Sequence, residues 1–242
     1  MTNKKHTIVA ALIAAALTPQ AAKADLSGSL ENNVTSNYVY RGQVLDSNPV
    51  LVPKLSLQLP LLTGGTLQLS TEQVLGTKGS TFYRGQYNVG LSLNTGRFKL
   101  TPGYQVVAYP GRDAANTQSV TAKVEVDDSG LFPVKLNPAL SVEKDIDPKG
   151  GYSYEGSVAP GKKFGKLDVS TPVALGVASK GYYSNSNDDT HYAYASVGLS
   201  SVYHATDRLA LKAGVTYYNT SKRLSNASDN FVSATAGVAV AF

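Results

Sequence analysis

Histidines and acidic residues are the first candidates for chemistry, because the chain contains no cysteine. His191 follows Asp188 and Asp189 in a stretch rich in serine and asparagine, so a His–Ser–Asp hydrolase site is conceivable there. The other histidine beyond the N-terminal region, His204, lies 13 positions further along the same expected strand and cannot share that site. Serine and aspartate recur in every polar segment of this chain. The pattern is therefore unspecific, and we expect no enzyme.

Metal and cofactor sites have equally little support in the sequence. The absence of cysteine excludes iron–sulfur clusters, disulfides and cysteine-based zinc sites. Asn185, Asn187, Asp188 and Asp189 carry oxygen ligands that could hold calcium weakly. A solvated loop explains the same composition better. We therefore expect neither a metal nor a cofactor.

The first 24 residues have the organisation of a cleaved secretory signal peptide. Lys4 and Lys5 precede the apolar run Ile8–Leu17, and Ala22-Lys23-Ala24 offers the small residues of a cleavage site. A transmembrane anchor is the alternative, but the run is about half of the ~20 residues that a spanning helix needs. Removal of residues 1–24 leaves 19 basic against 17 acidic residues, a net charge of +2. This small charge disfavours a nucleic-acid partner.

The remaining chain, 25–242, alternates apolar and polar residues with the period of a β-strand. The segment from Phe231 to Phe242 shows the pattern most clearly, with Val232, Val238 and Val240 on one face. Turn-forming clusters divide the chain into 12 expected strands. They lie near 26–41, 50–60, 65–75, 81–94, 97–109, 117–127, 133–145, 150–158, 166–180, 190–203, 207–219 and 229–242. The expected fold is all-β: a transmembrane up-and-down antiparallel β-barrel of about 12 strands.

Loop lengths and aromatic residues suggest the orientation of such a barrel. With both termini in the periplasm, the connections on the outer side are longer on average, as in bacterial outer-membrane barrels. Fourteen of the 15 tyrosines then fall in outer strand halves or outer loops, and most phenylalanines fall near the periplasmic side. This sorting predicts two aromatic girdles. The terminal Phe242 resembles the C-terminal assembly signal of these barrels.

Alternation also assigns charged residues to the inside of the barrel. A charge costs several kcal/mol on the lipid-facing surface at mid-bilayer, so these side chains are expected to line the lumen. Cations and acids are nearly balanced, which predicts weak ion selectivity, with mild anion attraction by Arg41 and Arg84 at the outer mouth. The same residues could instead pair and plug the barrel. The expected lumen-lining residues are Glu31, Arg41, Lys54, Glu72, Arg84, Lys99, Lys123, Glu125, Lys135, Glu143, Glu155 and Lys212.

One segment resembles a known family. Residues 29–43 contain Val34, Ser36, Tyr38, Arg41 and Gly42 in the N-V-x-S-x-Y-x-x-R-G pattern, followed by Pro49 and Leu55. This pattern is similar to the first strand of the TorF-type (Gcw_chp) proteobacterial outer-membrane porins. The resemblance covers roughly 30 residues and implies an outer-membrane channel.

The expected function is passive diffusion of small polar or ionic solutes through a narrow outer-membrane channel. The expected partners are outer-membrane lipid, the barrel-assembly machinery and the solutes themselves. Three alternatives stay open at this point. They are a plugged barrel acting as a lipid-modifying enzyme, an adhesin or structural barrel, and a secreted soluble β-sandwich.

Overall fold

The protein forms a closed antiparallel β-barrel of 12 strands, which confirms the expected fold class. The computed structural model describes residues 26–61, 64–77, 82–110, 116–132, 134–147, 150–182, 191–221 and 230–242. The signal peptide expected over 1–24 and the polar stretch 185–189 lie outside the described residues. Within the described part, no helix is long and apolar enough to cross a membrane.

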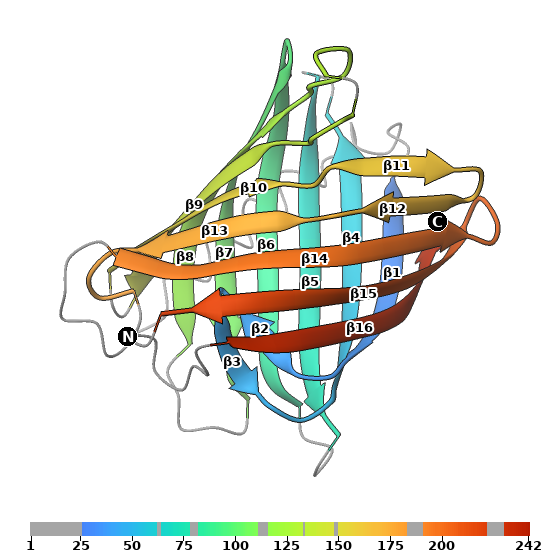
Figure 1. The fold of residues 1–242 in the computed structure, drawn as a ribbon. Coiled ribbons are helices and arrows are strands. Elements are labelled where there is room, and N and C mark those ends of the chain that lie inside the picture. The colour runs from blue at the N-terminus through green and yellow to red at the C-terminus, as the bar shows by residue number, and fades with distance from the viewer. Residues whose placement is uncertain are drawn as a thin grey trace.

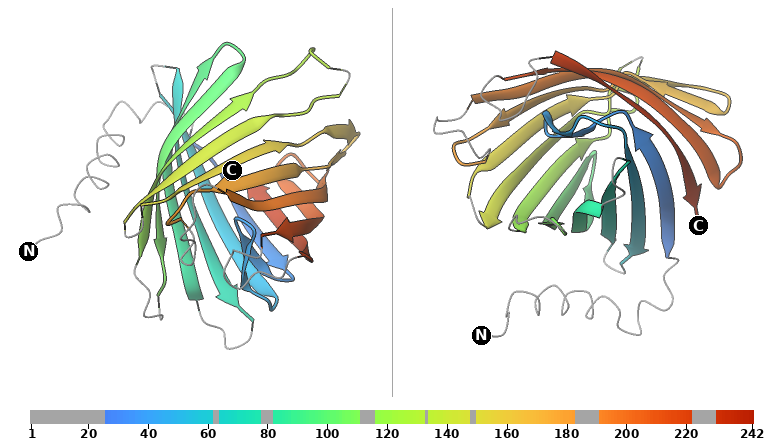
Figure 2. Two further views of the ribbon diagram at one scale, coloured as in Figure 1. Left: turned by 60° about the vertical axis from the view of Figure 1, so that its left-hand side comes forward. Right: turned by 90° about the horizontal axis from the view of Figure 1, so that it is seen from below.

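Each strand of the ring pairs antiparallel with its neighbour along the chain, and β1 pairs with β16 to close it (Figure 1). Ser29 lies opposite Ala241 at this closure. The strands are strongly tilted, so those at the front and back cross in projection (Figures 1 and 2). The ring consists of β1 (Ser27–Thr35), β4 (Val50–Pro60), β5 (Gly65–Gly76), β6 (Phe82–Thr95), β7 (Phe98–Ala108), β8 (Thr117–Val126), β9 (Ala139–Asp147), β10 (Tyr152–Val158), β13 (Val173–Ala178), β14 (His191–His204), β15 (Leu209–Thr220) and β16 (Asn230–Ala241).

The apolar residues of the alternating pattern form the outer surface of this ring. Leu30 on β1 lies opposite Val240 on one side and Leu55 on the other, so the three side chains share a face. Leu30 is 52% exposed and Val34 is 51% exposed. A largely apolar exterior of this kind is what a barrel in lipid requires.

Two strands of the ring are interrupted by prolines. After β10 the chain passes Pro160 and continues as β11 (Gly161–Phe164), and β12 (Leu167–Ser170) is separated from β13 by Pro172. Proline has no N–H to donate to a sheet ladder, which explains both breaks. The long connection expected over 158–166 is therefore mostly strand, and its turn is reduced to Gly165 and Lys166.

The seventh expected strand, which corresponds to β9, begins later than expected. The strand predicted over 133–145 starts at Ala139, because the connection after β8 is held by a buried side chain instead. Asp128 is 1% exposed and accepts hydrogen bonds from the backbone N–H groups of Leu136 and Asn137. This arrangement places the connection at the end of the barrel where β1 begins and β16 ends, which we call the terminal end. The opposite end is called the loop end.

The first segment departs most from expectation. The strand predicted over 26–41 stops at Thr35, and the chain then turns into the barrel as β2 (Tyr38–Tyr40) and β3 (Gln43–Asp46). We call Tyr38–Asp46 the inner hairpin; it lies inside the ring in the right panel of Figure 2. Arg41 and Gly42 have φ values of 48° and 78°, as a tight two-residue hairpin turn requires. The main buried apolar cluster, Tyr38, Val50, Val52 and Val74, joins the hairpin to the barrel wall.

Candidate functional site

The lumen is the candidate site, and cross-strand register shows which residues line it. Glu31 lies opposite Lys54, and Lys54 lies opposite Glu72, so the three belong to one face of the sheet. The hydroxyl of Tyr38, in the inner hairpin, donates to Glu72 Oε1 at 3.0 Å. This face is therefore the inside of the barrel.

A first polar cluster fixes the base of the inner hairpin to β5 and β6. Arg84 donates to the Tyr38 hydroxyl, and its guanidinium lies 4.4 Å from the centre of the Tyr40 ring. Its Nη1 is 4.0 Å from Glu72 Oε1. Arg84 is 1% exposed, although it lies in a lumen.

A second cluster holds the tip of the hairpin on the far wall. Arg41 Nη2 lies 2.8 Å from Glu143 Oε2 on β9, and its Nη1 donates to Ser153 Oγ on β10 at 3.0 Å. Glu143 also accepts hydrogen bonds from Ser119 at 2.9 Å and from the Tyr40 hydroxyl at 3.3 Å. The inner hairpin thus reaches from β1 across the lumen to β9 and β10.

Tyrosines complete the loop end of the lumen. The Tyr194 hydroxyl donates to Glu155, and the Tyr194 ring lies 6.4 Å from the Tyr218 ring. Gly42 sits directly against Tyr194, because a Cβ at Gly42 would be 2.6 Å from the Tyr194 Cβ. The interpretation of the tyrosines as an outer girdle is therefore wrong for Tyr38, Tyr40, Tyr194 and Tyr218, whose rings lie inside.

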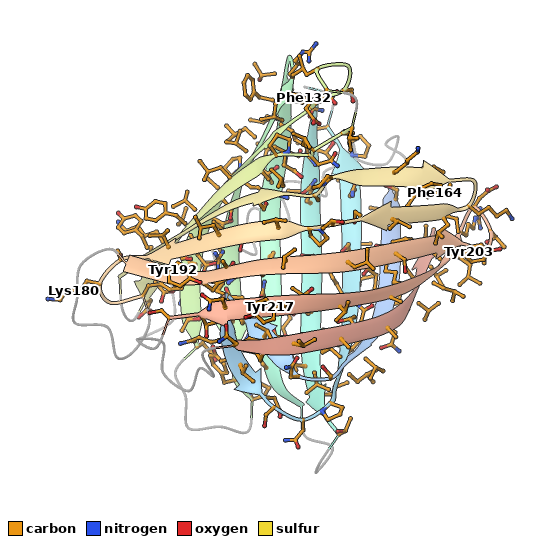
Figure 3. All side chains as sticks on the ribbon, viewed as in Figure 1. Phe132, Phe164, Lys180, Tyr192, Tyr203 and Tyr217 are labelled. Carbon is orange, nitrogen blue, oxygen red and sulfur yellow. The ribbon has the colours of Figure 1, made fainter. Side chains whose placement is uncertain are left out.

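Other aromatic residues do face outward near the two rims. Tyr192 and Tyr217 are exposed toward the loop end, and Phe132 and Phe164 are exposed at the terminal end (Figure 3). Tyr203 is also exposed at the terminal end, near Phe164 (Figure 3). The outward-facing rings alone form the girdle-like arrangement.

The terminal end of the lumen holds solvated ion pairs. Glu31 lies 2.8 Å from Lys212, and Glu125 lies 3.2 Å from Lys99 and 2.9 Å from Lys123. These side chains are one-fifth to one-half exposed, unlike Arg84 and Glu143. Such pairs contribute little to stability individually, but they balance each other's charge along the pore.

Most of the expected lumen residues lie on the inner face of the ring strands, and two of them lie outside these strands. Arg41 lies in the turn of the inner hairpin instead of a ring strand. Lys135 lies in the connection between β8 and β9, paired with Asp127 at 3.7 Å near the terminal rim. The expected anion attraction by Arg41 and Arg84 loses its basis, because Arg84 is buried and Arg41 faces Glu143.

The histidines do not come together. His191 and His204 bound the two ends of β14. His204 Nε2 lies 2.9 Å from Asp168 Oδ2, a pair that the local sequence could not reveal because its members are 36 positions apart. Within the described ranges, no group of three or more His, Asp or Glu side chains is placed to hold a metal.

A cavity of about 360 Å³ lies beside the inner hairpin. Its barrel-side lining comes mainly from β1, β15 and β16, and it extends to Glu72 and Gln86. The lining residues that project from these three strands are Asn33, Thr35, Tyr218, Ser233 and Thr235. The inner hairpin narrows the lumen and leaves this space next to one part of the wall.

No protein-family model and no curated protein sequence matches this chain. Among solved structures, it is similar to the NanC porin, with a TM-score of 0.55 at 11% identity over 88% of this chain and 98% of that one. It is similar to the KdgM porin, solved in complex with disordered oligogalacturonate, with a TM-score of 0.52 at 14% identity over 89% and 99% of the chains. An outer-membrane channel from Pseudomonas putida F1 gives a TM-score of 0.56 at 12% identity over 90% and 95%. At these identities the likeness establishes the fold of an outer-membrane barrel.

Proposed function

We propose that this protein is a porin-like channel of a bacterial outer membrane, which allows passive diffusion of small polar or ionic solutes. The observation that carries the proposal is a closed ring of 12 strands with an apolar exterior and a polar interior. Twelve strands lie between the 8 of filled barrels and the 16 to 18 of wide porins. The similar structures include two porins and one outer-membrane channel.

The narrow lumen selects weakly between cations and anions. The ion pairs of Glu31 with Lys212 and of Arg41 with Glu143 support this, because each cancels a charge that would otherwise act on a passing ion. Strong selectivity needs one sign of charge to dominate the constriction. The space beside the inner hairpin favours an open channel over a plugged barrel.

The loop end faces the outside and the terminal end faces the periplasm. Short turns such as Gly165-Lys166 at the terminal end support this orientation, as do the long polar connections at the other end. In this arrangement residues 1–24 direct export, and the barrel-assembly machinery recognises Phe242. Lipid surrounds the apolar exterior.

We further propose that this channel is related to the TorF-type porins. Its support is that Tyr38, Arg41 and Gly42, which carry the resemblance, all make contacts that shape the inner hairpin. These contacts give a physical reason for retaining the pattern.

Planar bilayer recording tests the channel directly. Refolded protein comprising residues 25–242 is added to a bilayer under a salt gradient, with heat-induced mobility change on a gel as proof of folding. Discrete current steps with a reversal potential near zero are expected. A correctly folded barrel that carries no current would contradict the proposal, and lipid hydrolysis and adhesion would then be assayed.

A further inference from the structure

The barrel wall consists of two parts that differ in charge. The first part, β14, β15, β16 and β1, contains only two charged residues, Lys212 and Glu31, and these pair with each other at 2.8 Å. The remaining ring strands carry most of the other charged lumen residues, including Arg84 and Glu143. We call the first part the neutral wall and the second part, β4–β10 and β13, the charged wall.

The inner hairpin covers the charged wall at the loop end. Arg84 and Glu143 are 1% and 3% exposed, because Tyr38, Tyr40 and Arg41 lie over them. A solute passing the hairpin therefore meets few of these charges. The hairpin turns a barrel with many inward charges into one whose narrow part presents mostly uncharged groups.

The cavity lies against the neutral wall. Its residues from this wall carry the amide of Asn33, the ring and hydroxyl of Tyr218, and the hydroxyls of Thr35, Ser233 and Thr235. The hydroxyls of Ser233 and Thr235 each lie 3.3 Å from that of Thr35, so the three form one hydrogen-bonded group. The charged residue that borders the cavity, Glu72, accepts the Tyr38 hydrogen bond and lies 4.0 Å from Arg84. Its charge is thus largely compensated.

Amide and hydroxyl groups both donate and accept hydrogen bonds, which matches a solute whose own polar groups are hydroxyls. An aromatic ring adds an apolar surface beside them. A volume of about 360 Å³ corresponds to roughly a dozen water molecules, and it lies within the range of small-molecule pockets. An ion would lose part of its hydration there without gaining an opposite charge.

We infer that the narrow part of this channel is a passage for neutral, polyhydroxylated solutes of about monosaccharide size, which move along the neutral wall. This inference rests on the proposed channel function and specifies its solute class. The charged wall acts through its contacts with the inner hairpin, which keep the hairpin in place.

Uptake into proteoliposomes tests the inference with two probes, a hexose and the corresponding hexuronate, which have the same sugar ring. A radiolabelled neutral hexose is expected to enter at least about threefold faster than the hexuronate, which differs by one carboxylate. Equal rates, or faster entry of the hexuronate, would overturn the inference. The channel proposal would survive that outcome if bilayer currents were present. Absence of both currents and uptake would overturn both.

Introducing a negative charge into the cavity tests whether solutes pass along this part of the wall. Ser233→Asp is expected to slow hexuronate entry about tenfold further while the hexose rate falls less than about threefold. Ser56→Asp is the matched control, because Ser56 shares the inner face but does not line the cavity. If both variants change hexuronate entry equally, the passage does not follow the neutral wall, and the inference fails.

Discussion

The neutral wall and the charged wall face the same lumen, but they show two uses of an inward polar side chain. On the charged wall, Arg84 and Glu143 are buried beneath the inner hairpin and bind it through several contacts each. On the neutral wall, Asn33, Ser233 and Thr235 border open space. Inward polarity therefore does not by itself identify a pore surface. A constriction element decides which polar residues meet the solute.

The largest effect is expected from removing Arg84. Arg84→Ala leaves Glu72 and Tyr38 without their shared cationic partner and takes away the surface between the Tyr38 and Tyr40 rings. Loss of one partner of a buried charged cluster costs about 3–5 kcal/mol. We expect a lower free energy of unfolding in urea and a single-channel conductance raised about twofold or more as the hairpin leaves the charged wall.

Arg84→Lys is the control for this variant. It retains the charge but not the planar group, so it should lie between the native protein and Arg84→Ala in both measurements. Native conductance in Arg84→Ala would show that the hairpin stays in place without this contact, and the distinction between the two walls would then lose its cause.

A substitution that weakens the contacts of the hairpin tip should have a smaller effect on stability and conductance than the loss of Arg84. Glu143→Gln removes the carboxylate that faces Arg41 at 2.8 Å and keeps a similar shape. We expect a loss of about 2–3 kcal/mol in unfolding free energy, since a charge-assisted bond becomes a neutral one. Bilayer records should show added current fluctuations as the tip detaches. The matched control is Glu125→Gln, whose carboxylate lies in the solvated cluster at the terminal end. Equal fluctuation in both variants would argue against a special role for the tip.

Substitutions at two glycines distinguish the stability cost of an unfavourable backbone conformation from the cost of a steric clash. Gly42 and Gly64 have φ values of 78° and 80°, but a Cβ at Gly42 would meet Tyr194 while a Cβ at Gly64 would meet nothing within 4 Å. Gly64→Ala should cost about 1 kcal/mol for its left-handed backbone, and Gly42→Ala about 2 kcal/mol or more. Urea unfolding measures both. Equal costs would show that Tyr194 yields freely and that the hairpin tip is loosely packed.

The sequence predicts the ring well because each ring strand has an outer apolar face. The strands expected over 190–203 and 229–242 are found at 191–204 and 230–241. The break after Thr35 could not be predicted in this way, since alternation continues through Tyr38. Contacts with Glu72 and Arg84, 34 and 46 positions away, turn this segment inward. By contrast, the sequence of β16 contains no charged residue, and this feature alone indicates an uncharged section of the barrel wall.

The smallest effect is expected within the neutral wall itself, at Glu31 and Lys212. This pair is 20% and 31% exposed, so its loss should change the unfolding free energy by less than about 1 kcal/mol. Its effect on ions should be clearer, because Lys212→Ala removes the one cationic side chain that the strands of the neutral wall carry. The reversal potential in a salt gradient should shift toward cations, and Glu31→Ala should shift it toward anions. Lys99→Ala should shift it less, since Lys123 still lies 2.9 Å from Glu125. A larger shift in Lys99→Ala than in Lys212→Ala would place the ion path on the charged wall.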